Sequence, residues 1–214
     1  MSRSSPLARR PPGAYHHGDL RRALLVAAFE LLAERGLDGL ALREVARRAG
    51  VTHAAPYHHF ADKAALLAAL VEAGFEDLAM ALRAAGQAPG TNLERFANVG
   101  VAYVRFAADH PATFRLLFRP ELRSGVEPGG QAAVGEAGQA AFGVLLDAVR
   151  ACLASGEVAG DAQTLALSAW CLVHGLATLL LDGPLREHFD PTEQTELVAR
   201  RVTAVLASGL IPRR

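Results

Sequence analysis

The chain has 214 residues, of which 51% are hydrophobic and 21% are charged, and its 22 basic and 22 acidic side chains give a formal net charge of zero. This composition excludes a largely disordered chain, and the neutral total excludes a protein that coats nucleic acid indiscriminately. The charge is nevertheless divided unevenly. Residues 1–65 hold ten Lys or Arg and six Asp or Glu, whereas residues 66–214 hold twelve and sixteen. A basic front and an acidic remainder suggest two separate roles on one chain.

The sequence favours neither a secreted protein nor a membrane protein. Residues 1–14 carry Arg3, Arg9 and Arg10 but no apolar run, so we expect a flexible basic arm and a cytoplasmic protein. The apolar run 165–181 would be about 26 Å long as a helix, short of the roughly 30 Å hydrocarbon core, so we expect a helix buried on all sides within protein. Cys152 and Cys171 lie in apolar stretches, which favours two buried thiols.

The amino-acid composition and the spacing of Gly and Pro predict an all-α protein. Alanine and leucine dominate, and Gly or Pro recurs at intervals suited to helix ends. The expected helices span residues 19–35, 42–49, 52–59, 63–85, 92–110, 114–118, 131–155, 162–181 and 192–206. Thr52 and Asp62 are expected to cap helices, and Thr91 with Glu94 forms a capping box. The apolar helix is expected to follow Asp161, and Asp190 followed by Pro191 begins the last helix.

The segment 42–60, LREVARRAGVTHAAPYHHF, predicts a helix-turn-helix, because two short helices meet at a glycine that permits a tight turn. In that geometry the second helix presents its N-terminal half to the DNA major groove. Arg43, Arg47, Arg48 and Lys63 supply charge directed at phosphates, and Tyr57 supplies a hydroxyl.

The sequence RRALLVAAFELLAERGLDGLALREVARRAGVTHAAPYHHFADKAALL, residues 21–67, resembles the TetR family of bacterial transcriptional repressors, through its GVT, Y-x-H-F and D-K elements. YHHGDLRRALL at 15–25 and AWCLVHGLATLLLDG at 169–183 resemble a subgroup whose C-terminal domain is named for its Trp, His and Gly, here Trp170, His174 and Gly175. The resemblance implies a three-helix helix-turn-helix domain over residues 15–62, a connecting helix over 63–85, and a helical bundle for effector binding and dimerisation over 91–210.

The resemblance also implies which residues meet DNA. They are Arg43, Thr52, His53, Ala54, Ala55, Tyr57, His58 and Lys63. Ala41 departs from the family pattern, which has Thr or Ser there, so the second helix should lack a cap worth about 1 kcal/mol. Pro56 stands where many relatives have Leu and should stiffen the recognition helix.

An effector pocket is expected among the aromatic residues of the second half. The candidates are Tyr103, Phe106, Phe114, Phe118, Trp170 and His174, with Phe96 and Phe142 as further cavity residues. The alternative is that these side chains form core, since residues at helical spacing are usually packed, and that His174 is a hydrogen-bonded core or interface histidine. We expect no cofactor and no metal, because His16, His17, His53, His58 and His59 have no spacing that gathers three with a carboxylate.

We therefore expect a homodimer that pairs through helices 161–182 and 191–206 and binds double-stranded operator DNA. The resemblance implies that it is a repressor released by an unknown small molecule. A single helix-turn-helix offers few base contacts, so two recognition helices about 34 Å apart are needed. The alternatives are an all-α enzyme that uses His174 and a helical adaptor that binds protein through its basic half. The sequence offers the enzyme no nucleophile with a suitably spaced base and no phosphate-binding loop.

Overall fold

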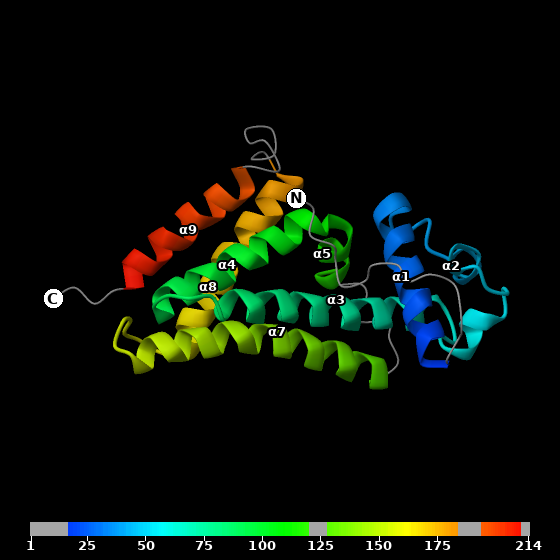
Figure 1. Ribbon diagram of the computed structural model, residues 1–214, viewed down its shortest axis with the longest axis horizontal. Helices are drawn as coiled ribbons and strands as arrows, with labels where there is room; N and C mark the ends of the chain where they lie inside the picture. Colours follow the sequence, from blue (N-terminus) through cyan, green and yellow to red (C-terminus); the bar gives the residue numbers. More distant parts are fainter. Residues whose placement is uncertain (1–16, 120–127, 184–193, 211–214) are drawn as a thin grey trace.

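A computed structural model of the chain describes residues 17–119, 128–183 and 194–210, and all the regular structure in these ranges is helical (Figure 1). The elements are α1 (His17–Arg35), α2 (Leu42–Ala49), the short 3-10 helix η1 (Ala55–His58), α3 (Lys63–Gly86), α4 (Asn92–Asp109), α5 (Pro111–Leu117), α7 (Pro128–Ala154), α8 (Ala162–Asp182) and α9 (Gln194–Leu210). The all-α prediction is therefore confirmed. The expected arm at 1–14 and the expected cap at Asp190 lie outside the described residues.

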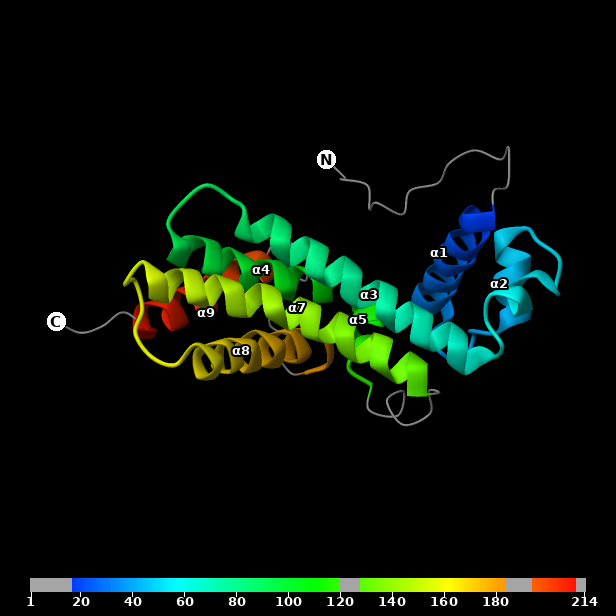
Figure 2. The ribbon, with the colours of Figure 1, turned by 90° about the horizontal axis from the view of Figure 1, so that it is seen from below.

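The helices form two bodies joined by α3. Figure 1 shows α1, α2 and η1 at one end of the molecule, and a bundle of the longer helices α4, α7, α8 and α9 at the other. Helix α3 begins in the small body and runs into the bundle, where it lies beside α7 (Figure 2). One helix is thus shared by the end that carries the helix-turn-helix and by the bundle.

The predicted caps at two helix starts are confirmed. The Asp62 carboxylate accepts from the Ala65 N–H at 2.8 Å. The structure adds a cap at Asp161, whose carboxylate accepts from the Thr164 N–H at 2.8 Å. Thr91 and Glu94 form the reciprocal capping box, with distances of 3.1 and 2.8 Å. As expected, Ala41 begins α2 without a side-chain cap.

The turn of the helix-turn-helix depends on Gly50, which ends α2 with φ of 71°, in the left-handed region that favours glycine. The N–H of the next residue, Val51, donates to the Ala46 carbonyl at 3.0 Å and so closes the helix end. The chain can therefore reverse within two residues and bring η1 close to α2.

The expected helix over residues 52–59, capped by Thr52, is wrong. Only a single 3-10 turn forms, over Ala55–His58, and it has no side-chain cap. Pro56 explains the difference, because it has no N–H to donate to the Thr52 carbonyl as an α-helix requires. The Ala55 N–H donates to that carbonyl instead, at 3.0 Å, which is the tighter pattern of a 3-10 turn.

Helix α5 lies between the small body and the bundle, in contact with α1, α3 and α4. Its approach to α3 requires Gly74, since a Cβ there would lie 2.9 Å from Leu117 Cδ2 and 3.0 Å from Thr113 Cγ2. A larger side chain would have to displace these two side chains. The α3–α5 crossing at Gly74 is therefore closely packed.

The expectation that α8 is buried on all sides is wrong for the single chain. Val173 and Leu176 are buried, but Leu167, Leu172 and Leu179 stay 50%, 36% and 46% exposed. Cys171 is also exposed, which corrects the expectation of two buried thiols, whereas Cys152 is buried as expected. Helix α8 and the part of α7 from Gly135 to Ala154 are long and apolar enough to cross a membrane, as are many helices that pack inside proteins.

Candidate functional site

The residues that the family resemblance assigns to DNA lie at the α2–η1 end of the molecule. Seven of the eight are exposed and Ala55 is half-buried; the exposed ones are Arg43, Thr52, His53, Ala54, Tyr57, His58 and Lys63. They come from the start of α2, the turn into η1, η1 itself and the first residue of α3. A surface of backbone turns and polar side chains is thus available to an external partner.

Local packing explains why η1 presents these side chains outward. Pro56 and Phe60 are both buried, so they hold the turn against the core. Tyr57, between them, is 51% exposed, and its hydroxyl makes no hydrogen bond with another described residue. An exposed phenol without an internal partner is suited to donate to a phosphate.

Two of the arginines of α2, Arg47 and Arg48, form ion pairs within the chain. Arg48 forms a two-point ion pair with Glu34 and donates to Glu30 at 3.2 Å, and Arg47 donates to Glu44 at 2.8 Å. Hydrogen bonds from these arginines lower the pKa of Glu34 and Glu44. Both arginines thus bind carboxylates of their own chain, and their expected role at phosphates stays a prediction.

Arg43 and Lys63 are the cations of this surface that pair with no described carboxylate. The Arg43 side chain forms no ion pair or hydrogen bond with another described residue, and it lies in the first turn of α2. Lys63 donates from Nζ to the Leu37 carbonyl at 2.9 Å, which ties the α1–α2 turn to the start of α3. An ammonium has three N–H groups, so two remain for a phosphate.

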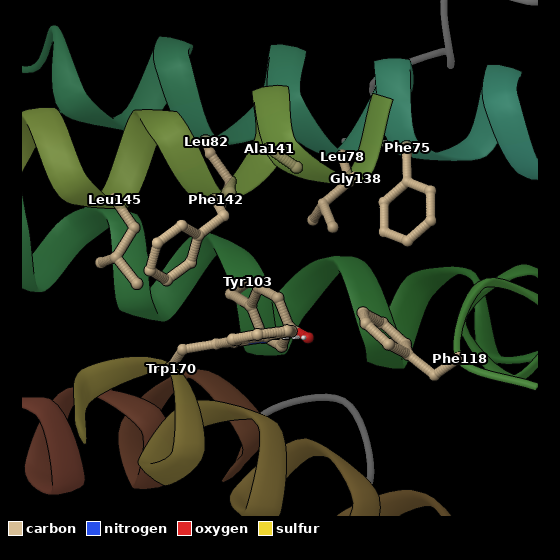
Figure 3. A pocket seen from close by; sticks show the side chains of 10 residues that line it. All are labelled: Phe75, Leu78, Leu82, Tyr103, Phe118, Gly138, Ala141, Phe142, Leu145 and Trp170. Atoms are coloured by element: carbon tan, nitrogen blue, oxygen red, sulfur yellow. Dashed lines mark hydrogen bonds between the residues drawn. The ribbon is translucent and has the colours of Figure 1, made fainter. Parts of the chain in front are cut away.

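A second candidate site is an apolar pocket inside the bundle (Figure 3). Its lining comes from α3, α4, the end of α5, α7 and α8, namely Phe75, Leu78, Leu82, Tyr103, Phe118, Gly138, Ala141, Phe142, Leu145 and Trp170. The free volume of this cavity is only about 30 Å³, which is room for roughly two waters. An organic ligand could enter only if the walls move apart.

A hydrogen-bonded chain of three side chains borders this pocket. Trp170 Nε1 donates to the Tyr103 hydroxyl at 3.2 Å, and that hydroxyl is hydrogen-bonded to His174 Nδ1, 2.8 Å away. Burial raises the pKa of Tyr103 above its usual value and lowers the pKa of His174 from 6.5. Burial thus favours the neutral forms of Tyr103 and His174, and Trp170 Nε1, Tyr103 Oη and His174 Nδ1 are hydrogen-bonded in one chain.

The six predicted effector residues occupy three kinds of position. Tyr103, Phe118 and Trp170 line the pocket. His174 and Phe114 lie just behind them, with ring centroids 4.5 and 5.0 Å from Phe118. Phe106 is buried and packs against His110, at 5.0 Å between centroids, so it does not line the pocket.

Sequence reasoning missed the walls supplied by α3 and α7, although it did name Phe142. Phe75, Leu78 and Leu145 have the pattern of ordinary core residues, and Gly138 has no side chain to notice. The signal that could have found them is the pair of small residues, Gly138 and Ala141, three apart on one face of a helix. In residues 17–119, 128–183 and 194–210 no group of three His, Cys, Asp or Glu is placed to hold a metal ion.

Comparison with known proteins matches both halves of the chain. Residues 24–70 match the model of a family described as bacterial regulatory proteins, tetR family, and residues 96–205 match one described as tetracyclin repressor-like, C-terminal domain. The second match includes Trp170, His174 and Gly175.

Solved structures resemble the whole chain. A protein of unknown function from Rhodococcus sp. RHA1 is 38% identical, covers 92% of this chain and 98% of its own, and has a TM-score of 0.77. The TetR family regulator PfmR from Thermus thermophilus is 18% identical over 88% of this chain and 99% of its own, with a TM-score of 0.66. FadR from Bacillus subtilis, solved with stearoyl-CoA, is 18% identical over 88% and 98%, with a TM-score of 0.70. At that identity the last two establish a shared fold.

Proposed function

The chain belongs to the TetR family of bacterial regulatory proteins, and on that premise we propose that it is a homodimeric repressor that leaves its operator when a small molecule enters the apolar pocket. The observation that carries this proposal is the course of α3. Its first residue, Lys63, lies on the exposed DNA-binding surface, and its Phe75, Leu78 and Leu82 line the pocket. The protein would act in the cytoplasm, where the DNA is.

The DNA-binding step is tested by electrophoretic shift on duplex from upstream of the protein's own gene and on pool-selected duplexes. Arg43→Ala removes an exposed, unpaired cation from the proposed interface. We expect it to weaken specific binding by about 5- to 10-fold and to reduce the slope of log affinity against log salt by about 1.

Arg83→Ala is the matched control for this variant. Arg83 is an exposed arginine of α3 in the bundle, far from α2 along the helix, and its loss changes the net charge by the same amount. It should leave both affinity and salt slope unchanged. Equal effects of the two variants would mean that binding depends on total charge alone, and no binding to any duplex at low salt would end the repressor proposal in favour of an adaptor.

The dimer is proposed to form through the exposed face of α8 and α9. Seven large hydrophobic side chains in the described residues are exposed, and five of them lie on these two helices: Leu167, Leu172, Leu179, Leu197 and Val205. The two helices contact each other, so their apolar side chains can form one continuous patch. A second copy of the chain would bury that patch on both partners through a two-fold axis.

Leu167→Glu tests this interface against Met80→Glu. The two side chains are 50% and 49% exposed, but Met80 lies on α3. Light scattering should show that Leu167→Glu is monomeric and that Met80→Glu remains dimeric. A short bis-maleimide should also join two chains through exposed Cys171, while buried Cys152 stays unreacted. A dimer that survives Leu167→Glu would place the interface elsewhere.

The release step is supported by the small free volume of the pocket. A ligand that enters must separate α3 from α7 or α8, and any displacement of α3 reaches the DNA-binding surface. Such coupling is reciprocal, so operator DNA must weaken effector binding by the same factor.

A further inference from the structure

The chemistry of the pocket lining selects among possible effectors. Of its ten lining residues five are aromatic and none is charged. The polar side-chain atoms among them are Tyr103 Oη and Trp170 Nε1, and these are bonded to each other, with the tyrosine hydroxyl also bonded to His174. A carboxylate, phosphate or ammonium placed here would lose its hydration and find no countercharge, which is costly.

The arrangement of the aromatic rings favours a particular shape of ligand. Phe142 and Trp170 lie 5.6 Å apart between centroids, and Phe75 and Phe118 lie 5.7 Å apart in a T-shaped pair. Between them α7 presents Gly138, where even a Cβ would lie 3.6 Å from the Phe75 ring, an ordinary contact distance. Figure 3 shows these side chains arranged around one space, with Trp170 on the side opposite α3 and α7. Aromatic faces and edges in this arrangement offer a flat ligand edge-to-face contacts.

Resting on the proposed function, we infer that the pocket takes the uncharged aromatic part of a hydrophobic effector, a single or fused ring, and binds aliphatic or charged molecules of the same size less well. A dry cavity of about 150 Å³ holds benzene, several times the space that is free here. The ring therefore enters only by separating α3 from α7 or α8, and this displacement of α3 is what carries the effect to the DNA-binding surface.

The chain carries its own reporter for this site, because Trp170 is its only tryptophan and lies in the pocket wall. Toluene, methylcyclohexane and benzoate are titrated against the full-length protein with tryptophan emission as the readout. Toluene should give a saturable change, methylcyclohexane should bind at least about 5-fold more weakly, and benzoate at least about 100-fold more weakly. Equal binding of toluene and methylcyclohexane, binding of benzoate as tight as that of toluene, or no saturable change with toluene would each overturn the inference.

Gly138→Leu and Gly135→Leu form a matched pair on α7. A leucine at 138 projects toward Phe75 and fills the pocket, whereas a Cβ at 135 meets no atom within 4 Å. We expect toluene binding to be lost in the first variant and kept in the second. If Gly138→Leu does not fold, as judged by circular dichroism, Ala141→Leu fills the same wall. Toluene binding that persists in a folded, filled variant would overturn the inference.

A gel shift on the same preparations separates the two proposals. Operator binding without any toluene response leaves the repressor proposal standing and refutes the aromatic effector. A saturable toluene response without binding to any duplex supports the aromatic site and refutes the repressor.

Discussion

Two tyrosine hydroxyls in this chain should respond in opposite ways to the same chemical change. Tyr103→Phe removes the hydroxyl that accepts from Trp170 Nε1 and is hydrogen-bonded to His174 Nδ1. Tyr57→Phe removes an exposed hydroxyl that bonds no other described residue. The first variant perturbs the bundle and the second perturbs only the proposed DNA surface.

The magnitude for Tyr103→Phe follows from the groups left unpaired. Each unsatisfied buried donor or acceptor costs about 1–3 kcal/mol, and Trp170 and His174 are only half-buried, so we expect a total of about 2 kcal/mol. For a chain of this size that lowers Tm by about 4–8 °C. Operator affinity should change little at a temperature where the variant is folded.

For Tyr57→Phe we expect Tm to stay within about 1 °C, because exposed substitutions usually change stability by less than about 0.5 kcal/mol. Operator affinity should fall about 5-fold, the equivalent of one lost hydrogen bond of about 1 kcal/mol. Calorimetric melts at matched protein concentration and gel shifts measure the two effects. The reasoning is refuted if both variants melt alike, or if Tyr103→Phe melts within about 1 °C of the parent.

Two further variants test the pH response and the turn. Burial lowers the pKa of His174 from 6.5, so the unfolded chain binds this proton more readily; stability should be full above about pH 6.5, decline as pH falls below it, and level off below the folded pKa. Denaturant titrations of the parent and of His174→Asn between pH 7.5 and 5.5 should show a shallower decline in the variant, and identical slopes would contradict this assignment. Gly50→Ala forces a Cβ into φ of 71° and should cost about 1–2 kcal/mol, whereas Gly50→Asn should cost less; equal melting of both variants and the parent would show that the turn relaxes.

Local chemistry made the helix starts predictable. Asp62 and Thr91 with Glu94 cap through atoms within three residues of one another, so no tertiary knowledge is needed. The motif at 42–60 was recognised for the same reason. The length of its second helix was not predicted correctly, because the missing N–H of Pro56 outweighs the cap that Thr52 could provide.

Features that depend on which faces meet were harder to predict. Helix α8 is apolar nearly all round, and such a sequence does not say whether a face is covered by its own chain or by another. The partners of Arg48 are 14 and 18 residues away, on α1, and only the packing of α1 against α2 brings them together. The pocket walls on α3 and α7 are likewise a product of tertiary packing.

The close crossing of α3 and α5 at Gly74 makes α3 a lever with unequal arms. Lys63 lies eleven residues to one side, about 16 Å along the helix, and Leu82 lies eight residues to the other, about 12 Å. If α3 tilts rigidly about that crossing, a push of about 1 Å at Leu82 becomes a swing of about 1.4 Å in the opposite direction at Lys63. In a symmetric dimer the DNA-binding surfaces of both protomers would move, so the distance between them changes by up to twice that amount. The hydrogen bond from Lys63 to the Leu37 carbonyl links α1 and α2 to this movement of α3.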